Sequence, residues 1–83
     1  MEYLINHLPE RRLFITELDG SIAYVEYIIE NGCLDIFHTI VPPPIAGRGV
    51  AAALVKRAYE YAAEEGLKPK ASCSYAVRWL ERH

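Results

Sequence analysis

The chain has 83 residues, of which 52% are hydrophobic and 24% are charged, and its formal net charge is −2. These values exclude a disordered protein and leave no room for a second core, so we expect one domain over residues 1–83. Because the basic residues are scattered and the net charge is negative, the sequence lacks the basic patch expected of a nucleic-acid-binding protein.

The sequence also carries no sign of a membrane segment, a metal site or a disulfide. No apolar run approaches the ~20 residues of a membrane span, and no signal peptide opens the chain. Cys33, Cys73 and the three histidines are too scattered for a disulfide framework or a set of metal ligands. We therefore expect a cytoplasmic protein with two free thiols, no bound metal and no membrane contact.

Two turn dipeptides predict a run of antiparallel strands in the first half of the chain. Asp19-Gly20 and Asn31-Gly32 are each typical of a two-residue type I′ turn between paired strands. The strands that these turns predict are Arg12–Leu18, Ser21–Glu30 and Cys33–Val41, with a short edge strand near Tyr3–Asn6.

Tight turns also determine which residues face each other across the sheet. We expect Val25 to face both Phe14 and His38, and Tyr27 to face Ile36. Because successive side chains of a strand point to opposite faces of the sheet, we expect a mainly apolar set on the face toward the core: Phe14, Leu18, Ala23, Val25, Tyr27, Ile29, Leu34, Ile36, His38 and Ile40. The other face mixes apolar and acidic residues, so we expect it to be only partly covered.

A long helix is expected from Gly49 to Glu65, because apolar residues recur there at helical spacing with charged residues on the other side. Gly66 is placed to end this helix as a left-handed C-cap, with Leu67 folding back onto it.

A strand–helix–strand unit then completes the expected fold. Lys68–Ala71 predicts a short strand, and it should run parallel to Cys33–Val41 because such units make right-handed crossovers. Ser74–His83 predicts a last amphipathic helix. The sequence thus predicts an α+β fold: a mixed, mainly antiparallel sheet of about five strands with one long and one short helix.

The start of the long helix lacks the side-chain cap that such a start usually has. Gly47-Arg48-Gly49 stands where Ser, Thr, Asp or Asn would be expected. The glycines permit a sharp turn and a close approach, and outward-pointing amides with the helix dipole favour an anion, so a phosphate or pyrophosphate would satisfy them. The alternative is that a glycine serves as the cap and water takes the remaining amides. The stretch is neither a Walker loop nor a full dinucleotide-binding loop.

Three motifs in order resemble the GNAT superfamily of N-acetyltransferases, and more narrowly a compact group of small GNAT-like proteins. They are His38-Thr39-Ile40-Val41, Ala46-Gly47-Arg48-Gly49-Val50-Ala51 and Cys73-Ser74-Tyr75, and the resemblance covers nearly the whole chain. It implies that the loop amides hold the pyrophosphate of acetyl-CoA and that the preceding strand lies along the pantetheine. The cofactor-binding residues implied are Ile40, Val41, Ala46, Gly47, Arg48, Gly49, Val50, Ala51 and Cys73. Pro44 and Ala46 depart from the pattern, which usually has polar or basic residues there.

Three side chains are candidates for chemistry. Cys73 precedes a predicted helix, where a thiol has a lowered pKa, so it could act as nucleophile, donate a proton to the CoA sulfur, or simply pack beside the cofactor. Tyr75 could protonate the departing thiolate or pack at the rim. His38 could act as a base or be a hydrogen-bonded core histidine.

The resemblance implies an acetyl-CoA-dependent N-acetyltransferase, an acyltransferase whose partners are a CoA thioester and an unidentified amine. Two alternatives stay open: a non-catalytic CoA-binding module, and a small interaction domain whose loop binds no ligand. The chain is shorter than full GNAT enzymes and lacks the helices that usually shape their acceptor groove. A dimer could supply that missing wall, and the sequence leaves the oligomeric state open.

Overall fold

Turn residues with positive φ shape the first half of the fold. In the computed structural model, which describes residues 3–83, Asp19 and Gly20 have φ of 52° and 79°, and Asn31 and Gly32 have φ of 53° and 75°. These values are those of type I′ turns, as predicted. The turns join three long strands, β2 (Leu13–Leu18), β3 (Ser21–Glu30) and β4 (Cys33–Ile40).

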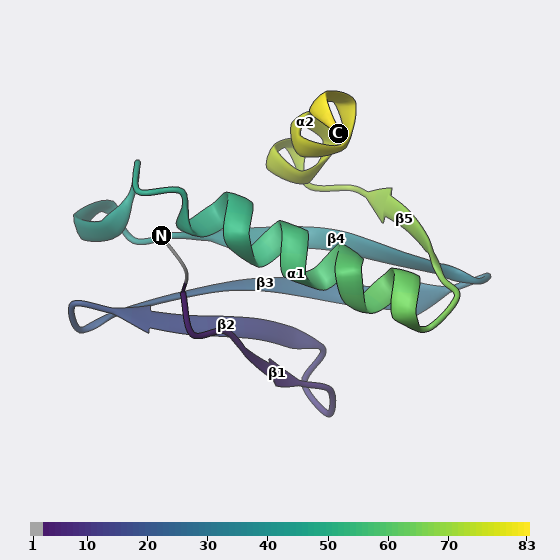
Figure 1. The fold of residues 1–83 in the computed structure, drawn as a ribbon, viewed down its shortest axis with the longest axis horizontal. Coiled ribbons are helices and arrows are strands. Elements are labelled where there is room, and N and C mark those ends of the chain that lie inside the picture. Colours follow the sequence, from purple (N-terminus) through teal and green to yellow (C-terminus); the bar gives the residue numbers. More distant parts are fainter. Residues whose placement is uncertain (1–2) are drawn as a thin grey trace.

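The sheet has five strands in the order β1-β2-β3-β4-β5, with β1 at Asn6–Leu8 and β5 at Lys68–Ala71 (Figure 1). The first four strands pair antiparallel, and β5 pairs parallel to β4. With helices α1 (Val50–Glu64) and α2 (Ser74–Arg82), this confirms the predicted mixed-sheet α+β fold.

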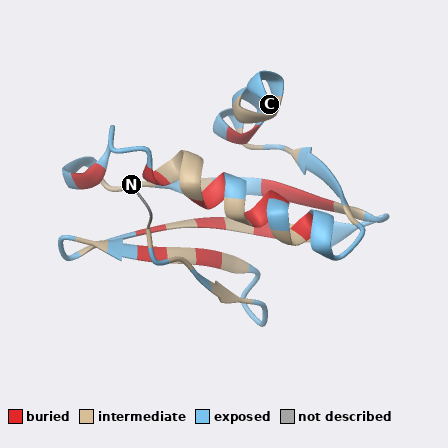
Figure 2. Cartoon of the chain, viewed as in Figure 1, coloured by how far each residue is buried: buried red, intermediate tan, exposed pale blue. Residues whose placement is uncertain are grey.

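Helix α1 lies across one face of the sheet, and the core lies between them (Figures 1 and 2). The buried apolar residues of the sheet are Phe14, Ala23, Val25, Tyr27, Leu34 and Ile36. Those of α1 are Val50, Leu54, Val55, Ala58, Tyr59 and Ala62. The predicted core face is therefore confirmed along most of its length, but Ile29 and Ile40 are 49% and 36% exposed.

The end of α1 follows its sequence signal. Gly66 has a φ of 71°, its amide donates to the Ala63 carbonyl, and the Leu67 amide donates to the Ala62 carbonyl at 2.8 Å. This pair of bonds is the Schellman arrangement that a left-handed glycine after a helix makes possible.

The predicted pairing of Val25 with His38 is wrong, because β4 contains a bulge. Tyr27 pairs with Ile36 as expected, but Glu26 pairs with His38 and Val25 with Thr39, which leaves Phe37 as an extra residue in β4. One inserted residue moves every later side chain to the other face. His38 is consequently exposed rather than in the core, and Thr39 takes its expected place on the side of α1.

The first strand begins later than predicted, at Asn6 rather than near Tyr3. The reason is the turn between β1 and β2: the Arg11 amide donates to the Leu8 carbonyl, and Arg12 has a positive φ of 56°. This turn sets His7 opposite Phe14.

The side chain of His7 fastens β1 to the core. Its Nε2 lies 2.6 Å from the Tyr27 hydroxyl, and its ring stacks on Phe14 with centroids 4.1 Å apart. The Tyr61 ring of α1 also lies against the His7 ring, with centroids 4.4 Å apart. Burial, followed by the positive charge of Arg57, lowers the pKa of His7, so the neutral ring is the form that this cluster favours.

Candidate functional site

The loop before α1 owes its shape to two glycines. Gly47 and Gly49 have φ of 82° and 79°, a conformation that side chains other than glycine rarely adopt. Gly49 is the N-cap of α1 and supplies no side-chain hydrogen bond to the helix. A Cβ placed at either glycine would meet no atom within 4 Å, so the space beside the loop is open.

The amides at the start of α1 are therefore available to a ligand. The first hydrogen bond of the helix joins the Ala53 amide to the Gly49 carbonyl. The amides of residues 50–52 therefore have no carbonyl partner within the helix. Such amides carry part of the positive end of the helix dipole. Their geometry and charge suit an anion such as a phosphate or pyrophosphate.

A cavity of about 310 Å³ opens beside these amides. It joins the end of β4, the loop, the first turn of α1 and the first turn of α2, and its lining residues are Val41, Ala46, Gly47, Gly49, Val50, Ala51 and Tyr75. The fold thus brings most of the expected cofactor-binding residues together with Tyr75. Ile40, Arg48 and Cys73 are not part of this lining.

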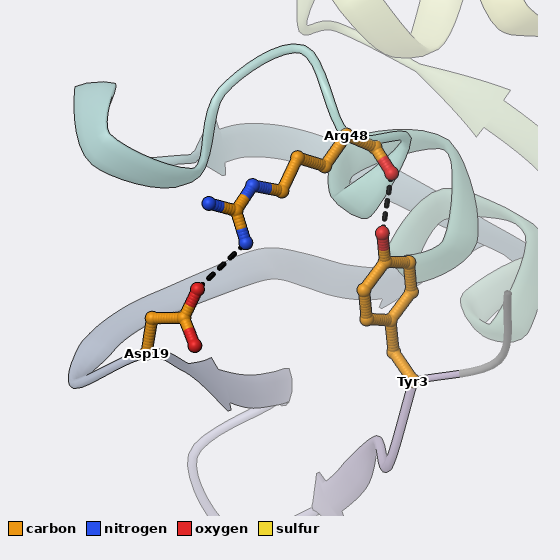
Figure 3. Close-up of polar contacts among 3 residues, drawn as sticks. All are labelled: Tyr3, Asp19 and Arg48. Carbon is orange, nitrogen blue, oxygen red and sulfur yellow. Dashed lines mark hydrogen bonds and ion pairs between the residues drawn. The ribbon is translucent and has the colours of Figure 1, made fainter.

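The side chain of Arg48 is directed toward the turn between β2 and β3 (Figure 3). Its Nη1 lies 2.6 Å from Oδ2 of Asp19, and the two side chains are 48% and 64% exposed. The Tyr3 hydroxyl donates to the Arg48 carbonyl, so two distant segments hold the loop in place. Tyr3 and Asp19 are functional candidates that the sequence did not indicate, because they lie 45 and 29 residues from Arg48.

Strands β4 and β5 separate close to this cavity. Their pairing runs from Cys33–Lys68 to Ile36–Ala71, whereas β4 continues to Ile40 alongside β3. The Ile36 carbonyl accepts from the amides of both Ser72 and Cys73, at 3.0 and 3.2 Å, as the chain turns into α2. The last residues of β4 therefore extend past β5, and strand backbone of this kind can pair with an extended ligand.

Cys73 lies at this separation, as the N-cap of α2. Its Sγ donates to Oγ1 of Thr39 at 3.3 Å. Burial opposes ionisation of the thiol. The ionised sulfur, however, can accept hydrogen bonds from the Thr39 hydroxyl and from the amides of Ala76 and Tyr75, and these outweigh burial, so the pKa of Cys73 is lowered. The bulge in β4 is what provides Thr39 on this side of the sheet.

The other two candidates for chemistry are placed differently. Tyr75 is exposed and lines the cavity, near enough to α1 to border the loop. His38 follows the bulge, pairs across from Glu26, and lies on the sheet face opposite Thr39. Cys33 directly follows a turn, with its Sγ 3.8 Å from the Asn31 carbonyl, and does not lie beside Cys73.

A buried carboxylate near Cys73 was not expected from the sequence. Asp35 is 7% exposed, its Oδ2 accepts from the Ser72 hydroxyl at 2.8 Å, and its Oδ1 has no partner among residues 3–83. The bond ties β4 to the residue preceding Cys73. No sequence signal identifies it, because an acidic residue on a partly covered face normally remains solvated.

The chain is similar in sequence to known proteins. A family model described as GCN5-related N-acetyl-transferase matches residues 12–83. Protein NATD1 of Xenopus tropicalis is 31% identical over 95% of this chain and 75% of its own length. Protein NATD1 of Homo sapiens is 31% identical over 95% of this chain and 73% of its own length.

The chain belongs to the GCN5-related N-acetyltransferase family, because the family model covers residues 12–83, well over half of it. This confirms the superfamily that the three motifs predict. Neither of the two helices has the length and apolar character needed to cross a membrane, as judged over residues 3–83.

Proposed function

We propose that this protein binds acetyl-CoA and transfers its acetyl group to an amine. The observation that carries the proposal is the uncapped start of α1, which opens onto a cavity bordered by Gly47 and Gly49. Membership of an N-acetyltransferase family supports the same conclusion.

The residues present fit the cofactor in two respects. The amides that follow Gly49 offer hydrogen bonds and the positive end of the helix dipole to a pyrophosphate. The free end of β4, around Ile40 and Val41, offers backbone groups to the amides of the pantetheine. Because backbone atoms do most of this binding, Pro44 and Ala46 are compatible with it.

Acetyl-CoA supplies an activated acetyl thioester when it is bound. A backbone amide near the end of β4 would polarise the thioester carbonyl, as the amides of an oxyanion hole do. The amine must react in its neutral form, which for a lysine-like group is about one part in 10³ at pH 7.

We assign the protonation of the departing thiolate to Tyr75, because it follows Cys73 by two residues in the first turn of α2 and its side chain borders the cavity. Cys73 is assigned a contact beside the thioester rather than covalent chemistry, since its sulfur already has hydrogen-bond partners in Thr39 and in the first amides of α2. His38 can accept a proton only from an amine that approaches from the opposite sheet face.

The experiment is calorimetric titration with acetyl-CoA, followed by an assay of thiol release with a panel of amines. We expect binding, and thiol release that depends on at least one amine. Tyr75→Phe should lower kcat at least about tenfold with little change in CoA affinity. Binding without turnover for any amine would support a non-catalytic CoA-binding module instead. Absence of binding would refute the proposal.

A further inference from the structure

Asp35 is a buried carboxylate that takes no part in the proposed chemistry. It lies in β4, is 7% exposed, and pairs with Ile28 of β3 and Lys70 of β5. Its Oδ2 accepts from the Ser72 hydroxyl at 2.8 Å, whereas its Oδ1 is buried and has no partner among residues 3–83. The ion pairs within that range involve other carboxylates. Because a buried carboxylate with a single hydrogen bond costs stability, packing alone gives no reason for an aspartate here.

Two consecutive residues of β4 hold Ser72 at the place where the chain leaves β5 for α2 (Figure 1). The Asp35 carboxylate binds the Ser72 side chain, and the Ile36 carbonyl accepts from the Ser72 amide at 3.0 Å. The same carbonyl accepts from the amide of Cys73 at 3.2 Å. Ser72 is therefore fixed at both its backbone and its side chain, one residue before the N-cap of α2.

This attachment also determines the direction of the Cys73 side chain. Ile36 faces the core beneath α1, so the neighbouring Asp35 projects to the other face of the sheet, where Ser72 meets it. Cys73 follows in an extended conformation, with φ of −83° and ψ of 134°, and points to the face of α1. There its Sγ lies 3.3 Å from Oγ1 of Thr39.

Tyr59 of α1 is influenced by both Asp35 and Cys73. Its hydroxyl donates to the Lys70 carbonyl of β5 at 2.6 Å. Burial raises the pKa of Tyr59, and the charges of Asp35 and then of Cys73 raise it further. The carboxylate, the thiol and the phenol thus share one electrostatic environment, so a direct charge effect of Asp35 on the thiol has to be separated from an effect on its position.

We propose that Asp35 is a positioning residue of the cofactor site: through Ser72 it holds Cys73 and the first turn of α2 at the point where β4 and β5 separate. The amides of Tyr75 and Ala76 can bond the Cys73 sulfur only if this turn keeps its place. The Tyr75 side chain borders the cavity from the same turn. The inference rests on the proposed function and deepens it, because Asp35 would align the two side chains that we place beside the thioester.

The experiment measures the rate of Cys73 alkylation by iodoacetamide against pH, in the full chain without CoA, by mass spectrometry of the labelled peptide. In Asp35→Ala the midpoint of this profile should rise by about one pH unit, because the displaced thiolate loses its hydrogen bonds. Loss of a nearby negative charge would by itself lower the midpoint, so the sign of the shift separates positioning from a direct charge effect. Asp35→Asn keeps an oxygen that accepts the Ser72 hydroxyl, so its midpoint should not rise.

The same link can be tested from its other end. Ser72→Ala leaves the carboxylate buried without its bond, whereas Asp35→Ala/Ser72→Ala removes the buried charge as well and is the better-folded variant. The midpoint of this double variant should rise no further than that of Asp35→Ala, because the two residues act through one contact. Thr16→Val is the matched control: it removes a buried hydroxyl that donates to the Leu4 carbonyl, far from Cys73 in the sheet, and should leave the midpoint unchanged.

Activity provides a second measurement. Asp35→Ala should lower kcat at least about tenfold, because Tyr75 moves with the turn, and leave CoA affinity within about twofold, because the loop amides are untouched. A lower or unchanged midpoint in Asp35→Ala, or an equal rise in Asp35→Asn, would overturn the inference while leaving the proposed function standing. If the wild-type protein binds no CoA, the proposed function and this inference fail together.

Discussion

Replacing Gly49 by alanine tests the loop most directly. Gly49 has a φ of 79° and a ψ of 12°, so an alanine there costs about 1–2 kcal/mol of backbone strain. A Cβ at this position meets no atom within 4 Å, so no steric clash adds to that cost. Because domains of this size are stable by about 5–15 kcal/mol, the variant should fold, with Tm lowered by about 4–8 °C per kcal/mol. The new methyl group would lie in the cavity that Gly49 lines, so CoA affinity should fall at least about tenfold.

The opposite end of the same helix provides the control. Gly66 also has a positive φ, of 71°, and its added Cβ would likewise meet no atom within 4 Å. Gly66→Ala should therefore lower stability by the same amount and leave CoA affinity unchanged. Thermal melting and calorimetry on both variants separate strain from binding. If Gly49→Ala binds CoA as tightly as wild type, or if both variants weaken binding equally, the loop does not hold the pyrophosphate.

Three further outcomes follow from the geometry of single side chains. Cys73, with its lowered pKa, should react with iodoacetamide faster than Cys33, and saturating CoA should protect it. If the two cysteines are labelled at the same rate and CoA changes neither rate, Cys73 does not belong to the site. The pKa of His7 is lowered by burial and by Arg57, so the unfolded chain binds more protons than the native one near pH 6. The contribution of His7 to the free energy of unfolding should therefore be fully present above the ordinary histidine pKa of about 6.5 and decline as the pH falls below it. Urea unfolding at several pH values should show a smaller pH dependence in His7→Gln. Arg48→Ala should change CoA affinity less than about threefold, because its exposed guanidinium is paired away from the cavity; loss of detectable binding in calorimetry would show that the side chain dominates.

Local chemistry accounts for the parts of the fold that the sequence predicts well. The dipeptides Asp19-Gly20 and Asn31-Gly32 tolerate the positive φ that type I′ turns need, and so they set the three long strands. Gly66 ends α1 for a similar local reason. The missing side-chain cap at Gly49 is equally visible in the sequence, and it marks the loop that lies beside the cavity.

Other features depend on contacts between distant segments. The bulge at Phe37 cannot be read from alternation, because an apolar residue at that position fits a regular strand as well as a bulged one. That single insertion exchanges His38 for Thr39 on the side of α1, and so decides which side chain meets Cys73.

The direction of the Arg48 side chain and the burial of Asp35 also depend on contacts between residues far apart in the sequence. Asp19 reaches Arg48 across 29 residues, and Ser72 reaches Asp35 across 37, so no local pattern contains either pair. The cavity between α1 and α2, whose lining includes Lys56, Arg78 and Arg82, likewise exists only because β5 returns the chain and α2 packs beside α1. The sequence by itself therefore determined the turns, the helix ends and the uncapped loop, since each depends on neighbouring residues. Tertiary structure alone decided which side chains surround that loop, because the sheet register and the helix packing bring them there from distant parts of the chain.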